Sequence, residues 1–378
     1  RKTRIVCISD THNQTPKLPP GDILIHAGDL TNQGSLTELQ KSVAWLERQP
    51  FEAKIVVAGN HDTTLDAPFF HSHSSTWKWP TAQDPVECKK LVMQAHGVTY
   101  LENETATIYL TKETGPKTCL SVFGSPFSPG RRGWAFQYWG ADEAEQVWSK
   151  IGDGVDVLVT HTPAYGFVDA AGGDGAARAG CEVLRRRLGV VRPLVHVCGH
   201  IHGGRGVERV RWRNGDGGGR VEQEGLDSLV EVKEAWSDSG KGNKKLSLVD
   251  LTKRGGKEIH NAGLTRHVMD ESLRDLFESS MPESEGPQSG TLEANPTSSL
   301  DDVALRDSEA ESWTRKAGGA VEWRHSDIGR SEVDAQEKAM RDRHETVMIN
   351  AAFLGPRDAG PMTFNKPIVV DVELPVWE

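Results

Sequence analysis

Short apolar runs alternate with helical patterns from residue 4 to about residue 212, and this alternation leaves few possible folds. The runs with the length and β-branched content of strands are 4–9, 22–26, 53–58, 105–110, 118–123, 155–160 and 193–198. Helices are predicted over 35–48, 85–96, 142–150 and 178–188. Strands that alternate with helices in this way predict an α/β domain built on layered sheets.

Residues 213–343 have a different composition, rich in Ser, Glu, Asp and Gly. The only aromatic residues among these 131 are Trp236, Phe277, Trp313 and Trp323. Such a segment cannot bury enough apolar surface to offset the entropy lost on ordering. We therefore predict a long, mostly disordered insertion with weak helices at 271–278 and 332–344. Strands at 346–353 and 367–373 should then let residues 344–378 complete the domain that residues 1–212 begin.

The charge is concentrated in one place, because residues 270–343 carry 18 acidic and 9 basic side chains while the whole chain has a net charge of −10. Protein partners could bind this acidic insertion, whereas nucleic acid is not an expected partner because no basic tract occurs. No run approaches the ~20 apolar residues of a membrane span, so a membrane protein is not expected. Five cysteines without a CxxC pair argue against a disulfide scaffold and suggest a cytoplasmic location. The chain starts at Arg1, so the natural N-terminus could be missing, and the oligomeric state stays open.

Polar motifs stand at the ends of five predicted strands, where α/β proteins commonly build their sites. They are Asp10-Thr11-His12, Gly28-Asp29, Gly59-Asn60-His61-Asp62, His161 and Gly199-His200-Ile201-His202. Oxygen and nitrogen ligands without thiolate suit Mn²⁺, Fe or Zn²⁺. This set is too large for one ion and fits two ions that share a carboxylate. Paired metals roughly 3.5–4 Å apart typically catalyse hydrolysis at phosphorus.

The order of these motifs resembles the signature of the calcineurin-like metallophosphoesterase superfamily. Within this superfamily, the sequence is more similar to the metallophosphoesterase-domain-containing branch first described in vertebrate brain, which has fungal relatives. The segments that carry the closer similarity are Ile8-Ser-Asp-Thr-His-Asn, Ala58-Gly-Asn-His-Asp-Thr, Gly124-Ser-Pro-Phe-Ser-Pro and Thr160-His-Thr-Pro-Ala-Tyr-Gly-Phe-Val-Asp. The resemblance covers about 4–206 and 347–375 but not the insertion. It implies a four-layer αββα sandwich of two mixed sheets flanked by helices.

The resemblance also implies roles for individual residues around two divalent ions, of which Mn²⁺ is favoured. Asp10, His12 and His202 would bind the first ion, Asn60, His161 and His200 would bind the second, and Asp29 would bridge them. A metal-bridging hydroxide would attack phosphorus. His61 would protonate the leaving group or stabilise the phosphate, with Asp62 orienting its ring. Some vertebrate members of the branch have Gly at the position of His200, so the complete set here favours turnover.

Candidate substrate contacts are Arg131, Arg132, Trp134 and Gly203, because a nucleotide would use guanidinium groups on its phosphate and an indole under its base. An exposed loop and a plain glycine turn are the alternatives. We interpret His26 and His196 as core residues, and His71 and His73 as surface residues. The predicted activity is that of a phosphodiesterase on small or nucleotide substrates. The alternatives are a phosphomonoesterase and a nucleotide-binding scaffold with little turnover.

Overall fold

The computed structural model describes most of the chain outside the acidic segment. The described residues are 1–77, 79–130, 133–171, 177–213, 225–236, 245–255, 257–259, 312–315, 320–324, 343–356 and 361–377. Arg131 and Arg132 lie outside this set, as do the weak helix predicted at 271–278 and most of that predicted at 332–344. Within the described ranges no helix is both long and apolar enough to cross a membrane.

The first sheet has six strands in the order β15–β19–β1–β2–β3–β4. Their bounds are Ser247–Asp250, Ile368–Glu373, Lys2–Ile8, Ile23–Ala27, Ala53–Val57 and Val98–Tyr100, in that order. Strands β1 to β4 run parallel, and β19 runs antiparallel to β1. Every residue of β2 and β3 is buried, as expected for parallel strands that are covered on both faces.

The second sheet has nine strands in the order β14–β13–β18–β12–β9–β6–β5–β17–β16. Their bounds are Val230–Ala235, Gly206–Trp212, Glu345–Asn350, Val195–Cys198, Val157–Thr160, Cys119–Ser125, Glu104–Leu110, Ala320–Arg324 and Ser312–Arg315. The strands β6, β9, β12 and β18 at its centre run parallel. Two small pairs join β7 (Ser128–Pro129) to β8 (Gln137–Tyr138) and β10 (Ala170–Ala171) to β11 (Ala177–Arg178).

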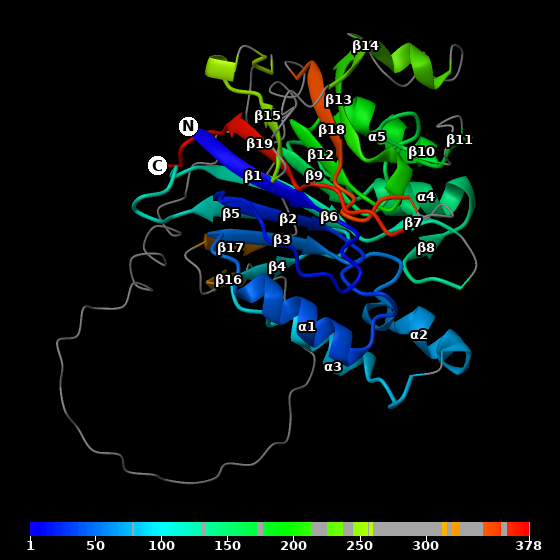
Figure 1. The fold of residues 1–378 in the computed structure, drawn as a ribbon. Coiled ribbons are helices and arrows are strands. Elements are labelled where there is room, and N and C mark those ends of the chain that lie inside the picture. The colour runs from blue at the N-terminus through cyan, green and yellow to red at the C-terminus, as the bar shows by residue number, and fades with distance from the viewer. Residues whose placement is uncertain are drawn as a thin grey trace, which may run out of the picture.

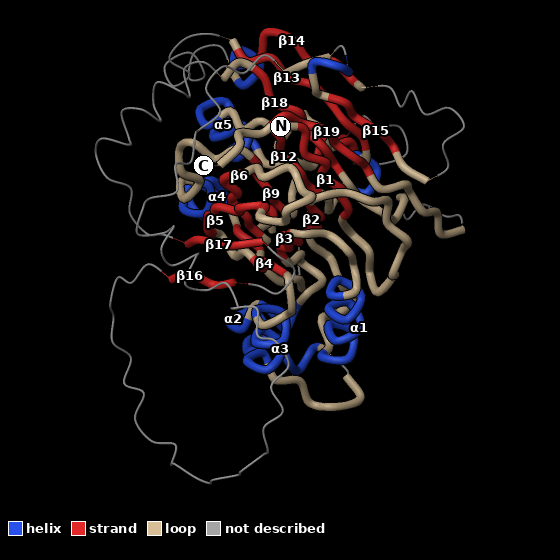
Figure 2. The backbone as a smooth tube through the Cα atoms, turned by 90° about the vertical axis from the view of Figure 1, so that its left-hand side faces the viewer, coloured by secondary structure: helices blue, strands red, loops and turns tan. Residues whose placement is uncertain are grey.

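Helices lie on the two outer sides of the paired sheets (Figure 1). On the side of the first sheet are α1 (Leu36–Glu47), α2 (Ala67–His73) and α3 (Pro85–Met93). On the other side are α4 (Gly140–Trp148) and α5 (Glu182–Val191), and Figure 2 shows the same layering from a second direction. Ser35 begins α1 with a capping box in which Glu38 binds back to the Ser35 amide. The short 3₁₀ turns are η1 (Thr63–Leu65), η2 (Ser74–Thr76), η3 (His202–Gly204), η4 (Leu226–Leu229) and η5 (Lys253–Gly255).

Three hydrophobic clusters separate the layers. The cluster between the sheets joins Ile5 and Ile25 of the first sheet to Val159 of the second. The outer face of the first sheet packs on α1 and α3 through residues such as Leu46, and the outer face of the second packs on α4 and α5 through residues such as Trp148. This arrangement confirms the predicted αββα sandwich of two mixed sheets.

The strands after residue 205 were only partly predicted. Strands β13, β14 and β15, together with β16 and β17, were not expected, and the last four lie in the range predicted to be mostly disordered. Strands at a sheet edge tolerate polar side chains that pair across the sheet, so segments of polar composition can form them. Arg209 and Arg211 of β13, for example, both bind Glu345 of β18.

Residues after 343 complete both sheets, since β18 lies between β13 and β12 and β19 lies between β15 and β1. Arg343 holds the start of this C-terminal part against the second sheet, because its buried guanidinium lies 2.6 Å from the carboxylate of Asp156. The N-terminal amine donates a hydrogen bond to the carbonyl oxygen of Leu374, so the two ends of the described chain lie side by side.

Candidate metal centre

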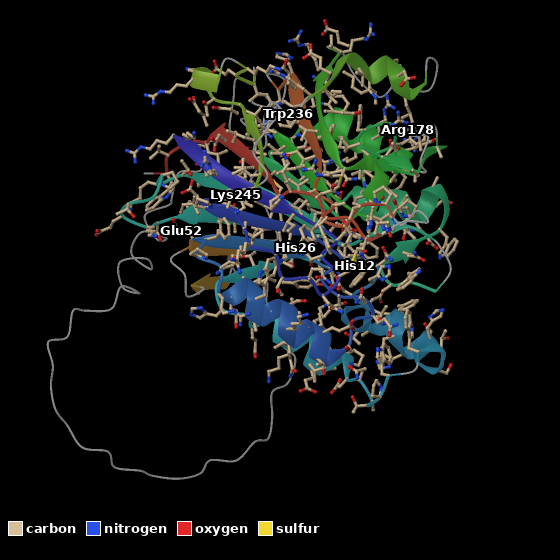
Figure 3. The ribbon with its side chains drawn as sticks, viewed as in Figure 1. His12, His26, Glu52, Arg178, Trp236 and Lys245 are labelled. Atoms are coloured by element: carbon tan, nitrogen blue, oxygen red, sulfur yellow. The ribbon has the colours of Figure 1, made fainter. Side chains whose placement is uncertain are left out.

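The predicted ligands follow parallel strands whose carboxyl ends meet at one edge of the sandwich. Asp10 and His12 follow β1, Asp29 follows β2 and Asn60 follows β3 in the first sheet. In the second sheet His161 follows β9, and His200 and His202 follow β12. Figure 3 shows His12 beyond the end of the first sheet and His26 farther back along it.

One group of side chains joins Asp10, His12 and His202. One ligand atom from each lies within 4.8 Å of the others. Nε2 of His202 is 3.3 Å from a carboxylate oxygen of Asp10, and Nε2 of His12 is 3.5 Å from one of Asp29. Asp10, His12 and His202 are the predicted ligands of the first ion.

A second group joins Asp29, His161 and His200, with ligand atoms again within 4.8 Å of one another. Nε2 of His161 lies 3.4 Å from Oδ1 of Asp29 and 3.0 Å from Oδ1 of Asn60. Asp29 therefore faces both groups, through Oδ2 towards His12 and through Oδ1 towards His161. This is the position that a bridging carboxylate requires.

Backbone carbonyls fix the orientation of three of these imidazoles. Nδ1 of His12 lies 3.1 Å from the carbonyl oxygen of Thr31. Nδ1 of His161 lies 2.9 Å from that of Ala27, and Nδ1 of His202 lies 3.2 Å from that of Gly355. A carbonyl oxygen only accepts hydrogen bonds, so Nδ1 must be the donor in each ring. Nε2 is thus presented to the site, as metal-binding imidazoles require.

The residues fit a pair of divalent cations. Nε2 of His12 is buried and has no hydrogen-bond partner among the residues that the structure describes. Such an atom is rare in a protein interior and is explained if it ligates a cation. The groups offer carboxylate, amide and imidazole donors without thiolate, a set that suits Mn²⁺, Fe or Zn²⁺.

The loops that carry the ligands are held in unusual backbone conformations. Asp10, His12, Asp29 and His200 have φ angles of 52°, 43°, 54° and 63°, in the left-handed region that non-glycine residues seldom adopt. Such conformations cost about 1–3 kcal/mol each and cluster at functional sites. A close approach also requires Gly199, because a Cβ there would lie 2.2 Å from Oδ2 of Asp10.

The carboxylates and imidazoles of the site shift one another's pKa values. Burial opposes ionisation of Asp10 and Asp29, but His202 brings the pKa of Asp10 down to about 2 and His161 holds the pKa of Asp29 well below its usual range. Burial likewise opposes protonation of His161, yet the charge of Asp29 outweighs it and raises the pKa of His161 to about 9. A cation that binds Nε2 of His161 must therefore displace a proton at neutral pH.

This proton sets the expected pH dependence of metal binding. Below about pH 9 His161 is protonated, so the apparent Mn²⁺ affinity of the second group should fall about tenfold for each unit of pH decrease. Calorimetric titration in buffers with different ionisation enthalpies would measure both this slope and the proton released. An affinity independent of pH between about 6 and 9, with no proton released, would contradict this reading of His161.

His61 lies beside the first group, and a ligand atom of its ring is within 4.8 Å of those of His12 and Asp29. Nδ1 of His61 donates to the carbonyl oxygen of Asn32 at 2.7 Å, so Nε2 is the nitrogen left to exchange a proton with a substrate. The ring of Trp134 packs on that of His61, with 3.7 Å between their centroids.

Asp62 links two of the ligand loops. Its buried carboxylate accepts hydrogen bonds from the amides of Leu30, Thr31 and Gly59, and so ties the loop after β2 to the loop after β3. Nδ1 of His61 bonds the carbonyl oxygen of Asn32, and the orienting role of Asp62 stays a prediction.

The remaining predicted residues lie in different surroundings. Gly203 is exposed in η3, directly after His202, while Arg131 and Arg132 fall outside the described residues. His71 and His73 are exposed on the helix α2. His26 and His196 are fully buried, and each bonds a threonine that adjoins a predicted ligand, Thr11 and Thr160 respectively.

Asn350 is a functional residue that sequence reasoning missed. Its buried amide donates to the carbonyl oxygens of Val168 at 3.0 Å and Ile201 at 2.8 Å, and so holds the turn between His200 and His202. Gly355 supplies the carbonyl that orients His202. Both residues follow the acidic segment, and no motif marks them, since one acts by a common side chain and the other through its backbone.

The two sheets thus bring two His/Asp groups together around one shared carboxylate, an arrangement suited to a pair of metal ions. The chain belongs to the calcineurin-like phosphoesterase family, whose sequence model matches residues 3–204. This confirms the family that the motifs predicted.

Curated relatives support the same assignment. The chain is 36% identical over 212 residues to metallophosphoesterase domain-containing protein 1 of Homo sapiens, covering 54% of this chain and 62% of the relative. A UPF0046 protein of Caenorhabditis elegans is 34% identical over 206 residues, which cover 54% of this chain and 65% of the relative. A fungal protein of Emericella nidulans named "Probable rhamnogalacturonate lyase C" is 44% identical over 211 residues, covering 55% of this chain and 18% of its own length. The chain thus spans less than two thirds of the length of each of these relatives.

Proposed function

We propose that the protein hydrolyses phosphodiesters of small molecules or nucleotides with two divalent cations, of which Mn²⁺ is the favoured ion. The observation that carries the proposal is Asp29, whose two carboxylate oxygens face two separate groups of ligands. Asp10, His12 and His202 would hold one cation, and Asn60, His161 and His200 the other. When bound, the cations neutralise the charge of the phosphate and bring the pKa of water towards about 7.

The protein's own contribution to the reaction is to hold the ligand loops rigid and to move a proton at His61. The Asn32 carbonyl fixes His61 through Nδ1, so Nε2 would deliver the proton that the leaving oxygen needs or donate a hydrogen bond to the phosphate. Either role is strongest in the transition state, where negative charge develops on oxygen.

The choice of a phosphodiesterase over a phosphomonoesterase rests on the similarity to the metallophosphoesterase domain-containing relatives. His200 completes the ligand set, which favours turnover over a scaffold that only binds nucleotides.

The choice between substrates is testable with Mn²⁺-loaded protein. We expect kcat/KM for bis(p-nitrophenyl) phosphate to exceed that for p-nitrophenyl phosphate by at least roughly tenfold, a difference of about 1.4 kcal/mol in transition-state binding. A preference for the monoester would identify a phosphomonoesterase. No turnover of either ester by protein that holds two metal ions would instead indicate a binding scaffold.

A further inference from the structure

A row of four aromatic rings leads away from His61. Trp134 contacts Trp77 with 5.3 Å between ring centroids, Trp77 stacks on Trp79 at 5.8 Å, and Trp79 stacks on Phe70 at 5.3 Å. We call these four residues the aromatic row. Its members come from two segments that are far apart in the sequence, one around α2 and η2 and the other the loop before β8.

The inner end of the row is fixed to the metal centre. The amide of Ala135, next to Trp134, donates to the carbonyl oxygen of Asn60 at 3.1 Å, and Asn60 is a proposed ligand. The amide of Phe136 donates to the carboxylate of Asp66 at 2.7 Å, which ties the same loop to the start of α2. The row is therefore positioned by the same loops that build the site.

The row also carries polar groups that its own packing does not use. The indole Nε1 atoms of Trp77 and Trp79 are shielded from solvent and have no hydrogen-bond partner among the described residues. Buried N–H groups are normally paired, so these two donors would bond an acceptor on a bound ligand once the side chains that cover them move aside. A nucleobase offers both ring faces for stacking and carbonyl or ring-nitrogen acceptors.

The position of His61 decides which part of the substrate would reach the row. In the proposed reaction a water molecule releases a proton to solvent, the resulting hydroxide oxygen bonds to phosphorus, and the bond from phosphorus to the leaving oxygen breaks. In the acid role of His61, that leaving oxygen takes a proton from Nε2, and solvent then reprotonates Nε2. The leaving group must then lie beside His61, and the ring packed against His61 is Trp134.

We infer that the aromatic row is a leaving-group subsite, and that the preferred substrates are phosphodiesters that release a nucleoside or another alcohol carrying an aromatic ring. This inference rests on the proposed function and adds the chemical class of the released alcohol. Stacking of one base on an aromatic side chain changes affinity by roughly 5- to 150-fold, which sets the size of the expected preference.

The test compares two methyl phosphodiesters whose leaving groups have similar acidity, one phenyl and one hexafluoroisopropyl, so that leaving-group chemistry is matched. The Mn²⁺-loaded wild type should cleave the phenyl ester with a kcat/KM about 5- to 100-fold higher. Trp77→Ala should raise KM for the phenyl ester by about tenfold and leave the fluoroalkyl ester unchanged, while Trp77→Phe should restore most of the difference. Trp377→Ala is the control, because that indole packs near Tyr109, outside the row.

The outcomes separate this inference from the proposed function. Equal cleavage of both esters by the wild type, or a Trp77→Ala variant with unchanged KM for the phenyl ester, would overturn the subsite and leave the diesterase standing. A Trp77→Ala variant that loses activity on both esters together with its metal would also overturn the subsite, since the ring would then only support the site. Failure to cleave either ester with two ions bound would overturn the proposed function and the subsite together.

Discussion

Replacing Asp29 by alanine should remove both metal ions from the protein and with them its hydrolytic activity. The two oxygens of Asp29 lie 3.5 Å from Nε2 of His12 and 3.4 Å from Nε2 of His161, one in each group of ligands. Removing a residue that only hydrogen-bonds to a metal ligand typically lowers metal affinity by roughly 10–100-fold. Removing a ligand that both ions share should therefore lower the affinity for each ion by more than about 100-fold. Activity should fall by more than the roughly 10²–10³-fold that follows from losing one stabilising donor.

Metal content measured by mass spectrometry, together with turnover of bis(p-nitrophenyl) phosphate, checks this expectation. Asp371→Asn is a matched control, because Asp371 is 1% exposed and Asp29 is 2% exposed, and both pair with cationic or imidazole groups. Asp371 lies in β19, opposite Arg4, and so at the other end of β1 from Asp10. An Asp29→Ala protein that keeps two ions would show that this carboxylate does not bridge.

Replacing His61 by alanine should leave both metal ions in place and slow the cleavage of esters with poor leaving groups by roughly 10²–10⁴-fold. The reason is that Nε2 is the only ring nitrogen free to give a proton, since Nδ1 is committed to Asn32. Alkoxides need this proton most, so the effect should shrink for p-nitrophenolate, which leaves without help.

A leaving-group series measured for the wild type and His61→Ala separates the two roles considered for this residue. A loss that grows as the leaving group becomes less acidic indicates an acid, and an equal loss for all leaving groups indicates a donor to the phosphate. His71→Ala is a suitable control, because His71 is an exposed histidine of α2. Unchanged turnover of the poorest leaving group would rule out the acid.

The strand-end motifs indicated which residues would come together, because each predicted ligand lies within four residues of the end of an apolar run. Asp10, Asp29 and Asn60 leave parallel strands of one sheet, so their convergence follows from the topology once the strands are identified. The alternation of strands and helices predicted layered sheets, and the family resemblance implied their four-layer arrangement.

The parts that were not predicted depend on contacts without a sequence pattern. Asn350 reaches the turn of His200 only because β18 inserts between β12 and β13, beyond a long stretch of unrelated composition. Strand β15 has only four residues and no apolar alternation, and β14 alternates only over residues 230–233, within a segment of polar composition. The aromatic row joins residues 70–79 to Trp134, and nothing in either segment alone indicates the other.

The measurement that tests the account most directly is anomalous diffraction at the manganese edge from crystals of the wild-type protein grown with Mn²⁺. We predict two peaks about 3.5–4 Å apart, with Asp29 bound to both ions and His12 and His161 on opposite sides. A single peak, or two peaks of which only one contacts Asp29, would contradict the dinuclear centre on which the proposed chemistry depends.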